Sequence, residues 1–429
     1  MKHAQWPVQD QVFWYLKREA STPCREDQQA DVAIIGGGMA GLMAAQAWIE
    51  RGKKVILLEQ YYCGSGATGK SSGFITQNAE LSLTDFSKWY GAEGARAIWD
   101  FFTAGMEDIR ENVKKYNFNC DYRQANTLEA ANSIKEARII KKEHETLQKL
   151  GYKSNFYDPV QLKQHLNVTG YFGAVEYEDT FGIDAYLYCQ EMKKMLIQKG
   201  VLIFEDTPVI ALQNHTLITA SQAKIEAEHI IVCADRFAPL LNIFASQIYH
   251  AQTFLLVSPE LDPSHVAQIF PNKEYMVWDV DLIYSYFRMA GNNRVLLGGG
   301  SLLTTYSGQE KHNYTRIVNK LTTYFHTKFP SLSLQFEHLW PGLIGLSKDI
   351  APIAGRDKNN PHVYCISAAA GLPIAAALGR YSAAHMLDGA KDMDHYFDPY
   401  RKFAIGSGLQ AILGKKISFA LSNLIAKKW

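Results

Sequence analysis

The sequence predicts a mixed α/β fold, in which a parallel strand–helix–strand unit near the N-terminus is joined to an antiparallel sheet. An apolar strand, Asp31 to Ile35, runs into three glycines and then into an Ala-rich helix from Met39 to Arg51. A second apolar strand, Lys54 to Leu58, completes a βαβ unit. Residues 245–300 contain strongly alternating apolar stretches, which are typical of antiparallel strands.

Length and composition restrict the class of protein. The chain has 429 residues, enough for two intergrown domains. Its 44 Lys and Arg residues oppose 43 Asp and Glu residues, and this balance argues against a nucleic-acid partner. The six cysteines show neither a C-x-x-C motif nor metal-ligand spacing, so we expect free thiols in a reducing compartment and no metal site. The chain begins without a signal-peptide pattern and contains no membrane-length apolar run, which predicts a cytoplasmic protein.

The three glycines belong to a G-x-G-x-x-G motif, formed by Gly36, Gly38 and Gly41, where the strand ends and the helix begins. The first glycine makes the tight turn, the second lets the backbone approach a pyrophosphate, and the third lets helix and strand pack closely. Glu59 follows the second strand, the place of a carboxylate that accepts hydrogen bonds from ribose hydroxyls. The motif predicts a Rossmann-type site for FAD or NAD, and the acid disfavours NADP.

With the stretches that follow it, this unit resembles the D-amino-acid-oxidase (DAO) superfamily of FAD-dependent amine and amino-acid oxidases. Within that superfamily, the sequence is most similar to gamma-glutamylputrescine oxidases and to glycine and sarcosine oxidases. The resemblance covers about residues 8–390. It is carried by Asp31 to Glu59, Gly64 to Gly73, Tyr284 to Gly300, Trp340 to Gly355 and Ala369 to Pro373.

The resemblance implies an α/β (α+β) fold of the glutathione-reductase-like, D-amino-acid-oxidase type. A Rossmann-type FAD-binding domain would be interleaved with an antiparallel-sheet substrate domain. The FAD-binding domain would comprise residues 31–110, 180–240 and 335–390, and the substrate domain residues 111–179 and 241–334. Residues 1–30 would form a short amphipathic helix, between Gln5 and Ala20, and a linker, and residues 391–429 an amphipathic tail.

FAD is the cofactor that the resemblance implies. Its predicted contacts are Gly36, Gly38, Met39, Ala40, Gly41, Glu59, Gln60, Ala67, Thr68, Gly69, Lys70, Ser71, Ser72, Gly73, Val209, Ala234, Gly342, Ile344, Gly371, Leu372 and Pro373. Val209 would lie beside the adenine, and the loop Ala67 to Gly73 around the flavin ring and the phosphates. Gly371 would open a helix whose N-terminus stabilises negative charge on the reduced flavin. The alternative is an Ala-rich helix that only packs tightly.

Three positions depart from the family pattern. Ile344 stands where amino-acid oxidases carry the arginine that holds the substrate carboxylate, and an apolar side chain cannot balance a buried carboxylate. An amine without a neighbouring carboxylate is therefore the favoured substrate. Gly342 stands where some relatives tether flavin through cysteine, and Lys70 where others tether it through histidine. We therefore expect noncovalent FAD.

Lys70, Tyr284 and Tyr286 are the candidate catalytic residues, and Ile344, Tyr275, Trp278 and Arg288 the candidate substrate residues. Lys70 would place a cation near flavin N5, or else be a phosphate neighbour or a surface lysine. The aromatic side chains would cover the substrate by cation–π and apolar contact, although about half of them would instead be buried by strand alternation. Arg288 would reach the pocket or end a strand in solvent. Asp279 and Asp281 would bind a distal ammonium or form a turn.

The predicted reaction is oxidative deamination of a small amine or polyamine derivative by hydride transfer from C–H to flavin N5, after which the imine is hydrolysed to an aldehyde. Oxygen or a quinone would be the electron acceptor. One alternative is a membrane-associated amino-acid dehydrogenase that passes electrons to quinone, with Arg288 or another arginine holding the carboxylate. Another is an FAD-binding redox sensor or assembly partner that turns over no amine.

The C-terminal segment, Phe403 to Trp429, has apolar residues at helical spacing and four lysines, which predicts a basic amphipathic helix. Such a helix lies on the inner face of an anionic membrane, docks on the protein's own body, or forms a dimer contact. The sequence leaves these alternatives open.

Overall fold

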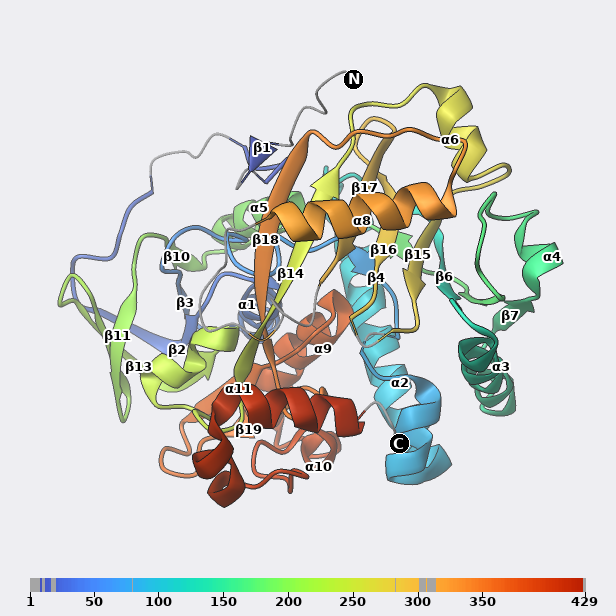
Figure 1. The fold of residues 1–429 in the computed structure, drawn as a ribbon. Coiled ribbons are helices and arrows are strands. Elements are labelled where there is room, and N and C mark those ends of the chain that lie inside the picture. The colour runs from blue at the N-terminus through green and yellow to red at the C-terminus, as the bar shows by residue number, and fades with distance from the viewer. Residues whose placement is uncertain are drawn as a thin grey trace.

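The computed structural model describes residues 8–9, 12–16, 21–78, 80–281, 283–300, 306 and 314–426. Within these residues two large sheets lie next to each other, and helices cover their outer faces (Figure 1). The mixed α/β architecture predicted from the sequence is confirmed. The position of each sheet matters for function because a cavity opens between them.

The predicted βαβ unit lies in an eight-stranded sheet. Strand β2 (Gln28–Ile35) pairs in parallel with β3 (Val55–Leu58), and helix α1 (Met39–Ile49) connects them. On its other side, β2 pairs in parallel with β13 (Lys224–Val232), which pairs in turn with β20 (Val363–Ser367). The remaining strands are β10 (Leu202–Phe204), β11 (Val209–Gln213), β12 (Thr216–Thr219) and β19 (Ile353–Arg356).

The second sheet has nine strands in the order β1-β18-β14-β17-β16-β15-β6-β8-β7, and most neighbours are antiparallel. Its strands are β1 (Val8–Gln9), β6 (Asn126–Ala130), β7 (Ser154–Tyr157), β8 (Ala174–Tyr177), β14 (Tyr249–Val257), β15 (Tyr275–Asp279), β16 (Tyr286–Ala290), β17 (Arg294–Gly299) and β18 (His338–Leu346). The predicted antiparallel sheet is confirmed. Strand β18 hydrogen-bonds within it, although the predicted FAD-binding domain included residues 335–390.

A small third sheet and the helices complete the fold. The small sheet consists of β4 (Phe74–Ile75), β9 (Phe181–Gly182) and β5 (Arg123–Gln124). The remaining helices are α2 (Leu83–Tyr116), α3 (Ile134–Lys149), α4 (Pro159–Leu162), α5 (Ala185–Gln198), η1 (Asp235–Leu241), α6 (Pro263–Ile269), α8 (Thr315–Lys328), α9 (Leu372–Ala383), η2 (Ala384–Asp388), α10 (Asp394–Phe397) and α11 (Ser407–Ala426).

Two helices, α1 and α8, contribute closely packed or buried side chains to the cores beside the two large sheets. Helix α1 is buried on almost every side and packs closely against α9, because a Cβ at Gly379 would lie only 2.3 Å from the Ala40 carbonyl oxygen. Helix α8 crosses the nine-stranded sheet and buries Leu321 and Phe325 against it (Figure 1). The sheets that wall the cavity are therefore supported on their other faces by closely packed helices.

The N-terminal segment differs from the prediction of a short helix. In its described part, Val8 and Gln9 form β1, which pairs in parallel with β18, and residues 12–16 are not helical. The Trp14 indole Nε1 donates to the Gly69 carbonyl oxygen at 2.7 Å, and its ring packs edge-on against Trp340 with centroids 5.0 Å apart. Of the side chains that suggested a helix, Trp14 is thus buried by contacts with the Gly64 to Gly73 loop and β18, whereas Leu16 is 61% exposed.

The C-terminal segment is helical, as predicted, but packs in an unexpected way. Helix α11 breaks at Gly414, whose φ is 75°, and the part that follows it turns both polar residues and Phe419 inward. The buried Asn423 amide donates to the Ser347 and Lys348 carbonyl oxygens at 3.0 and 2.8 Å. In the part of the chain that the structure describes, no helix is both long enough and apolar enough to cross a membrane.

Candidate active site

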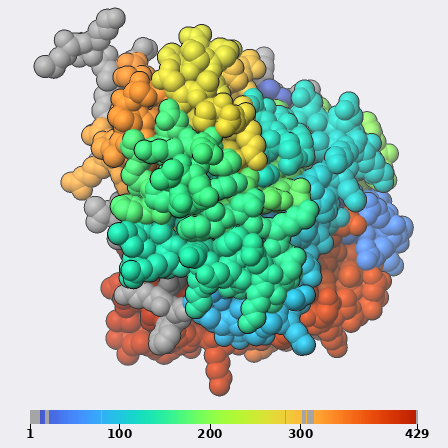
Figure 2. Space-filling view, turned by 90° about the vertical axis from the view of Figure 1, so that its right-hand side faces the viewer, coloured from blue at the N-terminus to red at the C-terminus, as the bar shows by residue number. Residues whose placement is uncertain are grey.

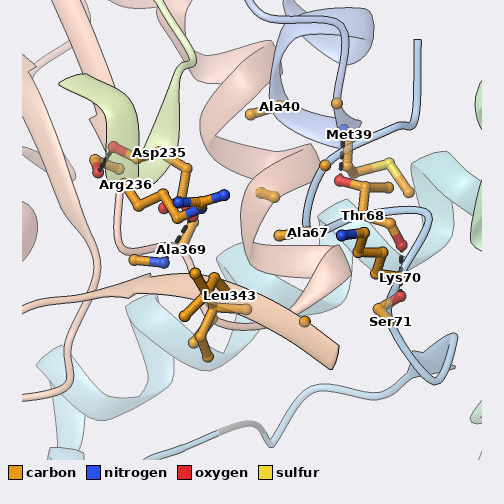
Figure 3. Close-up of a pocket in the computed structure, with 18 of the residues that line it drawn as sticks. Met39, Ala40, Ala67, Thr68, Lys70, Ser71, Asp235, Arg236, Leu343 and Ala369 are labelled. Carbon is orange, nitrogen blue, oxygen red and sulfur yellow. Dashed lines mark hydrogen bonds between the residues drawn. The ribbon is translucent and has the colours of Figure 1, made fainter. Parts of the chain in front are cut away.

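A cavity of about 770 Å³ lies between the two large sheets. Its walls include the carboxyl ends of β2, β3 and β13, the loop from Ser65 to Phe74, strand β18 and the N-terminus of α9. Parallel strands that end together, beside a helix N-terminus, form the usual site for a nucleotide in an α/β sheet. Figure 3 shows Met39, Thr68 and Lys70 on one side of this space, with Asp235 and Arg236 on the other and Leu343 between them.

The glycine motif has the close contacts that its sequence predicts. A Cβ at Gly36 would lie 2.4 Å from the Cys233 carbonyl oxygen, and a Cβ at Gly41 would lie 1.9 Å from the Gly36 carbonyl oxygen. Gly36 also has a φ of 107°, which side-chain-bearing residues rarely adopt. Gly36 and Gly38 line the cavity, whereas Gly41 does not line it and packs against the turn.

Glu59 lies at the carboxyl end of β3 and lines the cavity. Its two carboxylate oxygens accept hydrogen bonds from the backbone N–H groups of Gly37, at 2.7 Å, and Tyr61, at 2.9 Å. Burial raises the pKa of this carboxyl, and the backbone N–H groups oppose that rise. Because each carboxylate oxygen can accept more than one hydrogen bond, Glu59 orders the glycine turn and can still accept from a ribose hydroxyl.

The loop from Ser65 to Phe74 is held against both the glycine turn and β18. The Met39 backbone N–H donates to the Thr68 hydroxyl at 3.1 Å, the link drawn in Figure 3. At its other side, the Trp340 indole donates to the Lys70 carbonyl oxygen at 3.2 Å. A Cβ at Gly342 would lie 3.8 Å from the Lys70 Cβ. Lys70 therefore lines the cavity directly opposite β18.

Most predicted cofactor contacts line this one cavity. Those that do so are Gly36, Gly38, Met39, Ala40, Glu59, Gln60, Ala67, Thr68, Lys70, Ser71, Ser72, Gly73, Val209, Ala234, Gly342, Ile344, Gly371, Leu372 and Pro373. Gly41 and Gly69 lie behind the lining, where a Cβ would strike a backbone oxygen at 1.9 and 2.0 Å, respectively. A continuous cavity with backbone this close on one side fits an extended dinucleotide such as FAD.

The structure corrects the expectations for Arg288, which neither reaches the cavity nor ends a strand in solvent. Its side chain is buried, and its guanidinium donates to the carbonyl oxygens of Ser72, Ile183 and Met289 at 2.5, 2.7 and 2.7 Å. Burial lowers the pKa of this guanidinium to about 10. Arg288 supports the cofactor loop from behind, so its donors are not directed at a substrate carboxylate.

Tyr275 also lies outside the cavity lining, contrary to its predicted role at the substrate. It is buried in the core under the nine-stranded sheet, and its hydroxyl lies 2.8 Å from His165 Nδ1. Asp279 is likewise buried, where it accepts hydrogen bonds from Tyr171 and Tyr324 at 2.7 and 2.9 Å. The structure thus assigns Tyr275 and Asp279 to packing and internal hydrogen bonding.

The remaining aromatic candidates form one wall of the cavity. Trp278, Tyr284 and Tyr286 all line it, and the two tyrosine rings lie 5.6 Å apart. Burial holds the pKa of the Tyr284 hydroxyl well above its usual value, and this hydroxyl donates to Glu80 Oε1 at 2.9 Å. Glu80, which was not predicted from the sequence, also lines the cavity, from a loop without a motif of its own.

Asp235 and Arg236 are two further lining residues that the sequence analysis missed. Asp235 accepts from the backbone N–H groups of Gly345, at 2.7 Å, and Ala368, at 3.0 Å. Through these bonds it joins β18 to the segment that leads into α9. Both residues follow β13, which ends at Val232, by three and four positions, and ligands bind at the carboxyl ends of parallel strands, so this place in the sequence could have indicated them.

A glycine turn after β2, an acid after β3 and a long cavity that reaches an aromatic wall define a dinucleotide-dependent oxidoreductase. The family model described as FAD dependent oxidoreductase (DAO) matches residues 31–385, and the chain belongs to this family. It is therefore an FAD-dependent oxidoreductase, as its sequence predicted.

Individual relatives agree with this assignment. The chain is 27% identical to a probable oxidoreductase, OrdL, of Haemophilus influenzae, over 80% of this chain and 79% of the relative. It is 26% identical to the gamma-glutamylputrescine oxidoreductase of Escherichia coli, over 78% of each protein. The glycine oxidase structure of Geobacillus kaustophilus has a TM-score of 0.75 at 16% identity and covers 88% of this chain and 100% of that one, which shows a shared fold.

Proposed function

We propose that the protein oxidises an amine that carries no carboxylate beside its amino group, and converts it to an aldehyde and ammonia. The observation that carries the proposal is the apolar stretch of β18, Leu343 and Ile344, which crosses the cavity where a carboxylate-binding arginine would stand. The burial of Arg288 behind the loop supports it, because that guanidinium is satisfied by backbone carbonyls. The similarity to a gamma-glutamylputrescine oxidoreductase points to the same substrate class.

When bound, FAD supplies the hydride acceptor at N5. The aromatic wall of Trp278, Tyr284 and Tyr286 would hold the amine and its alkyl chain by cation–π and apolar contacts. The same wall would exclude water from the reacting carbon. Hydrolysis of the imine needs only water after oxidation, so positioning and desolvation are the main contributions of these residues.

Lys70 is the proposed catalytic cation. Its place opposite Gly342 on β18 puts a positive charge on the wall that the flavin ring would contact. A fixed charge there stabilises the negative charge that develops as the cofactor gains and passes on electrons.

Glu80 is the proposed anchor for a second, distal ammonium, and this role predicts a selective change in substrate affinity. Hydrogen bonds to charged groups contribute about 1.5–3 kcal/mol, so Glu80→Gln should raise KM for putrescine by roughly 10- to 100-fold. The KM for butylamine, which lacks the second ammonium, should change little. Tyr284→Phe is the matched control, because it removes the hydroxyl bonded to Glu80 and keeps the carboxylate. Equal KM increases for both amines in Glu80→Gln would contradict the proposed contact.

We also propose that FAD is bound noncovalently. Among the described residues that line the cavity, Cys233 is the sole cysteine and none is histidine. The family resemblance puts the two tethering positions at Gly342 and Lys70, neither of which can form the linkage. Cys233 lies beside Gly36, at the phosphate-binding turn rather than at β18. Denaturation in acid should therefore release the flavin into the supernatant. Flavin fluorescence that stays with the protein on a denaturing gel would contradict noncovalent binding.

A product assay tests the proposed function. The purified protein would be incubated with putrescine, gamma-glutamylputrescine, glycine or sarcosine, together with an artificial dye as electron acceptor. We expect an aldehyde and ammonia from the two amines, and neither glycine nor sarcosine should yield glyoxylate. Turnover of glycine or sarcosine alone would contradict the proposal.

Arg236 favours a second candidate function, an amino-acid dehydrogenase. It is the one arginine among the described lining residues, and the fold matches that of a glycine oxidase. In that case Arg236 would hold the substrate carboxylate. Arg236→Met would then strongly raise the KM for an amino acid. If the protein is the amine oxidase proposed above, the same change should leave amine turnover nearly unaltered.

A further inference from the structure

We propose that α11 docks the enzyme on the surface of an anionic lipid bilayer. The helix carries six of the 16 large hydrophobic side chains that the described residues expose: Leu409, Ile412, Ile417, Leu421, Leu424 and Ile425. Ile412, the most exposed of them, is 82% accessible. So many exposed apolar residues on one helix are typical of an interaction surface rather than of scattered surface positions.

After Gly414, α11 differs from an ordinary surface helix, because it buries several polar residues and exposes large apolar ones. The face toward the body combines Ser418, Ser422 and Asn423, all at most 3% exposed, with the fully buried Phe419. Asn423 is fixed there by its bonds to the Ser347 and Lys348 carbonyl oxygens. Ile417, Leu421 and their neighbours must therefore face outward, because rotating them inward would break these bonds and bury charge.

The charge around this apolar face favours a lipid surface as its occupant. Residues 399–429 contain six basic side chains and no acidic one. Among them, Lys415 and Lys416 are exposed on α11 itself, next to Ile417. Anionic headgroups attract such lysines while the apolar side chains enter the interface. A second copy of the chain would oppose this basic surface with an equally basic one, and like charges repel.

The position of α11 leaves this face accessible. Figure 1 shows the helix in dark red in the lower part of the molecule, and its outward side chains are exposed. Asn423, on its inner face, also lines the cavity. Docking through α11 would therefore place the cavity next to the bilayer surface, where a lipid-soluble quinone could accept electrons.

The test uses the full-length holoenzyme and co-sedimentation with vesicles. One set of vesicles is pure phosphatidylcholine, and the other is an equimolar mixture of phosphatidylcholine and phosphatidylglycerol. We expect the wild type to sediment with the anionic vesicles, to bind the neutral ones much more weakly, and to dissociate as salt increases. Leu421→Ser/Ile425→Ser and Lys415→Glu/Lys416→Glu should each lower the bound fraction at least tenfold, with FAD content unchanged.

Helix α3 provides the matched controls. It exposes Ile134 and Ile139, at 61% and 51%, together with Lys141 and Lys142. It lies on the right-hand side of Figure 1, which Figure 2 presents to the viewer, whereas α11 lies in the lower part of Figure 1. The corresponding serine and glutamate pairs in α3 should leave vesicle binding intact.

Three results would overturn the proposal. The first is a wild type that stays in solution with anionic vesicles. The second is an equal loss of binding in the α3 variants, which would show a nonspecific charge effect. The third is a wild type that binds no vesicles and is a dimer by light scattering, while the Leu421→Ser/Ile425→Ser variant is a monomer. That result would assign the face to a second copy of the chain.

Discussion

A Gly41→Val protein should be purified without flavin. The Cβ of any residue at position 41 would lie 1.9 Å from the Gly36 carbonyl oxygen, and both groups belong to backbone that is held on either side of the turn. Relief of the clash requires α1 to move away from β2, which destroys the pyrophosphate-binding geometry and destabilises the fold by about 1–3 kcal/mol. The FAD content, measured from the flavin absorbance of the folded protein, should fall below about a tenth of the wild-type value.

Gly408→Val is the control for this change. Nothing lies within 4 Å of a Cβ at Gly408, so the added side chain meets no neighbour. This variant should keep its full complement of FAD. A Gly41→Val protein that retains FAD in stoichiometric amount would show that the glycine turn does not hold the pyrophosphate.

Lys70→Met should slow the reaction of the reduced enzyme with oxygen by about 100-fold, while FAD binding stays intact. Methionine has nearly the length of lysine but no charge, so the change removes the electrostatic stabilisation and preserves packing beside Gly342. The measurement is stopped-flow reoxidation after anaerobic reduction by dithionite, which bypasses the amine. Lys70→Arg should restore most of the rate because it keeps the positive charge.

Reoxidation of Lys70→Met at the wild-type rate would remove Lys70 from the catalytic residues. If FAD were lost together with the rate, Lys70 would instead be a binding residue for the cofactor. Measuring flavin content and reoxidation in the same preparation separates these two outcomes.

The nucleotide half of the site could be predicted from the sequence because backbone geometry dictates residue type there. Gly36 and Gly41 are required because their contacts leave no room for a Cβ. Glu59 follows β3, and the neighbouring strand β2 leads into the glycine turn. These constraints are local in sequence. A single pattern therefore carries both the fold and the place of the cofactor.

The substrate half could be predicted only in part, because alternation along a strand does not say which face meets the cavity. In β15, Trp278 faces the cavity, whereas Tyr275 faces the core with Val277. In β16, Arg288 lies on the same face of the strand as Tyr286. Its guanidinium donates to the Ser72 carbonyl oxygen and does not reach the cavity. Tertiary packing, rather than the local sequence, decides which element covers each face of a strand.

Some residues carry no local pattern at all. Glu80 lies in a loop, and its carboxylate accepts a hydrogen bond from Tyr284, which is 204 positions away in the chain. Trp14 lies in the segment that was predicted to be helical but is buried beside Gly69 and Trp340, which are distant in sequence. Long-range contacts of this kind override local propensity.

The most direct test of the account is anaerobic bleaching of the flavin in the wild-type holoenzyme. The protein would be titrated separately with putrescine, gamma-glutamylputrescine, glycine, sarcosine and D-amino acids while the flavin absorbance is followed. The account predicts that the amines bleach the flavin and that the amino acids leave it oxidised, because Ile344 and the buried Arg288 offer no partner for a carboxylate. Bleaching by amino acids alone would contradict it and would direct attention to Arg236.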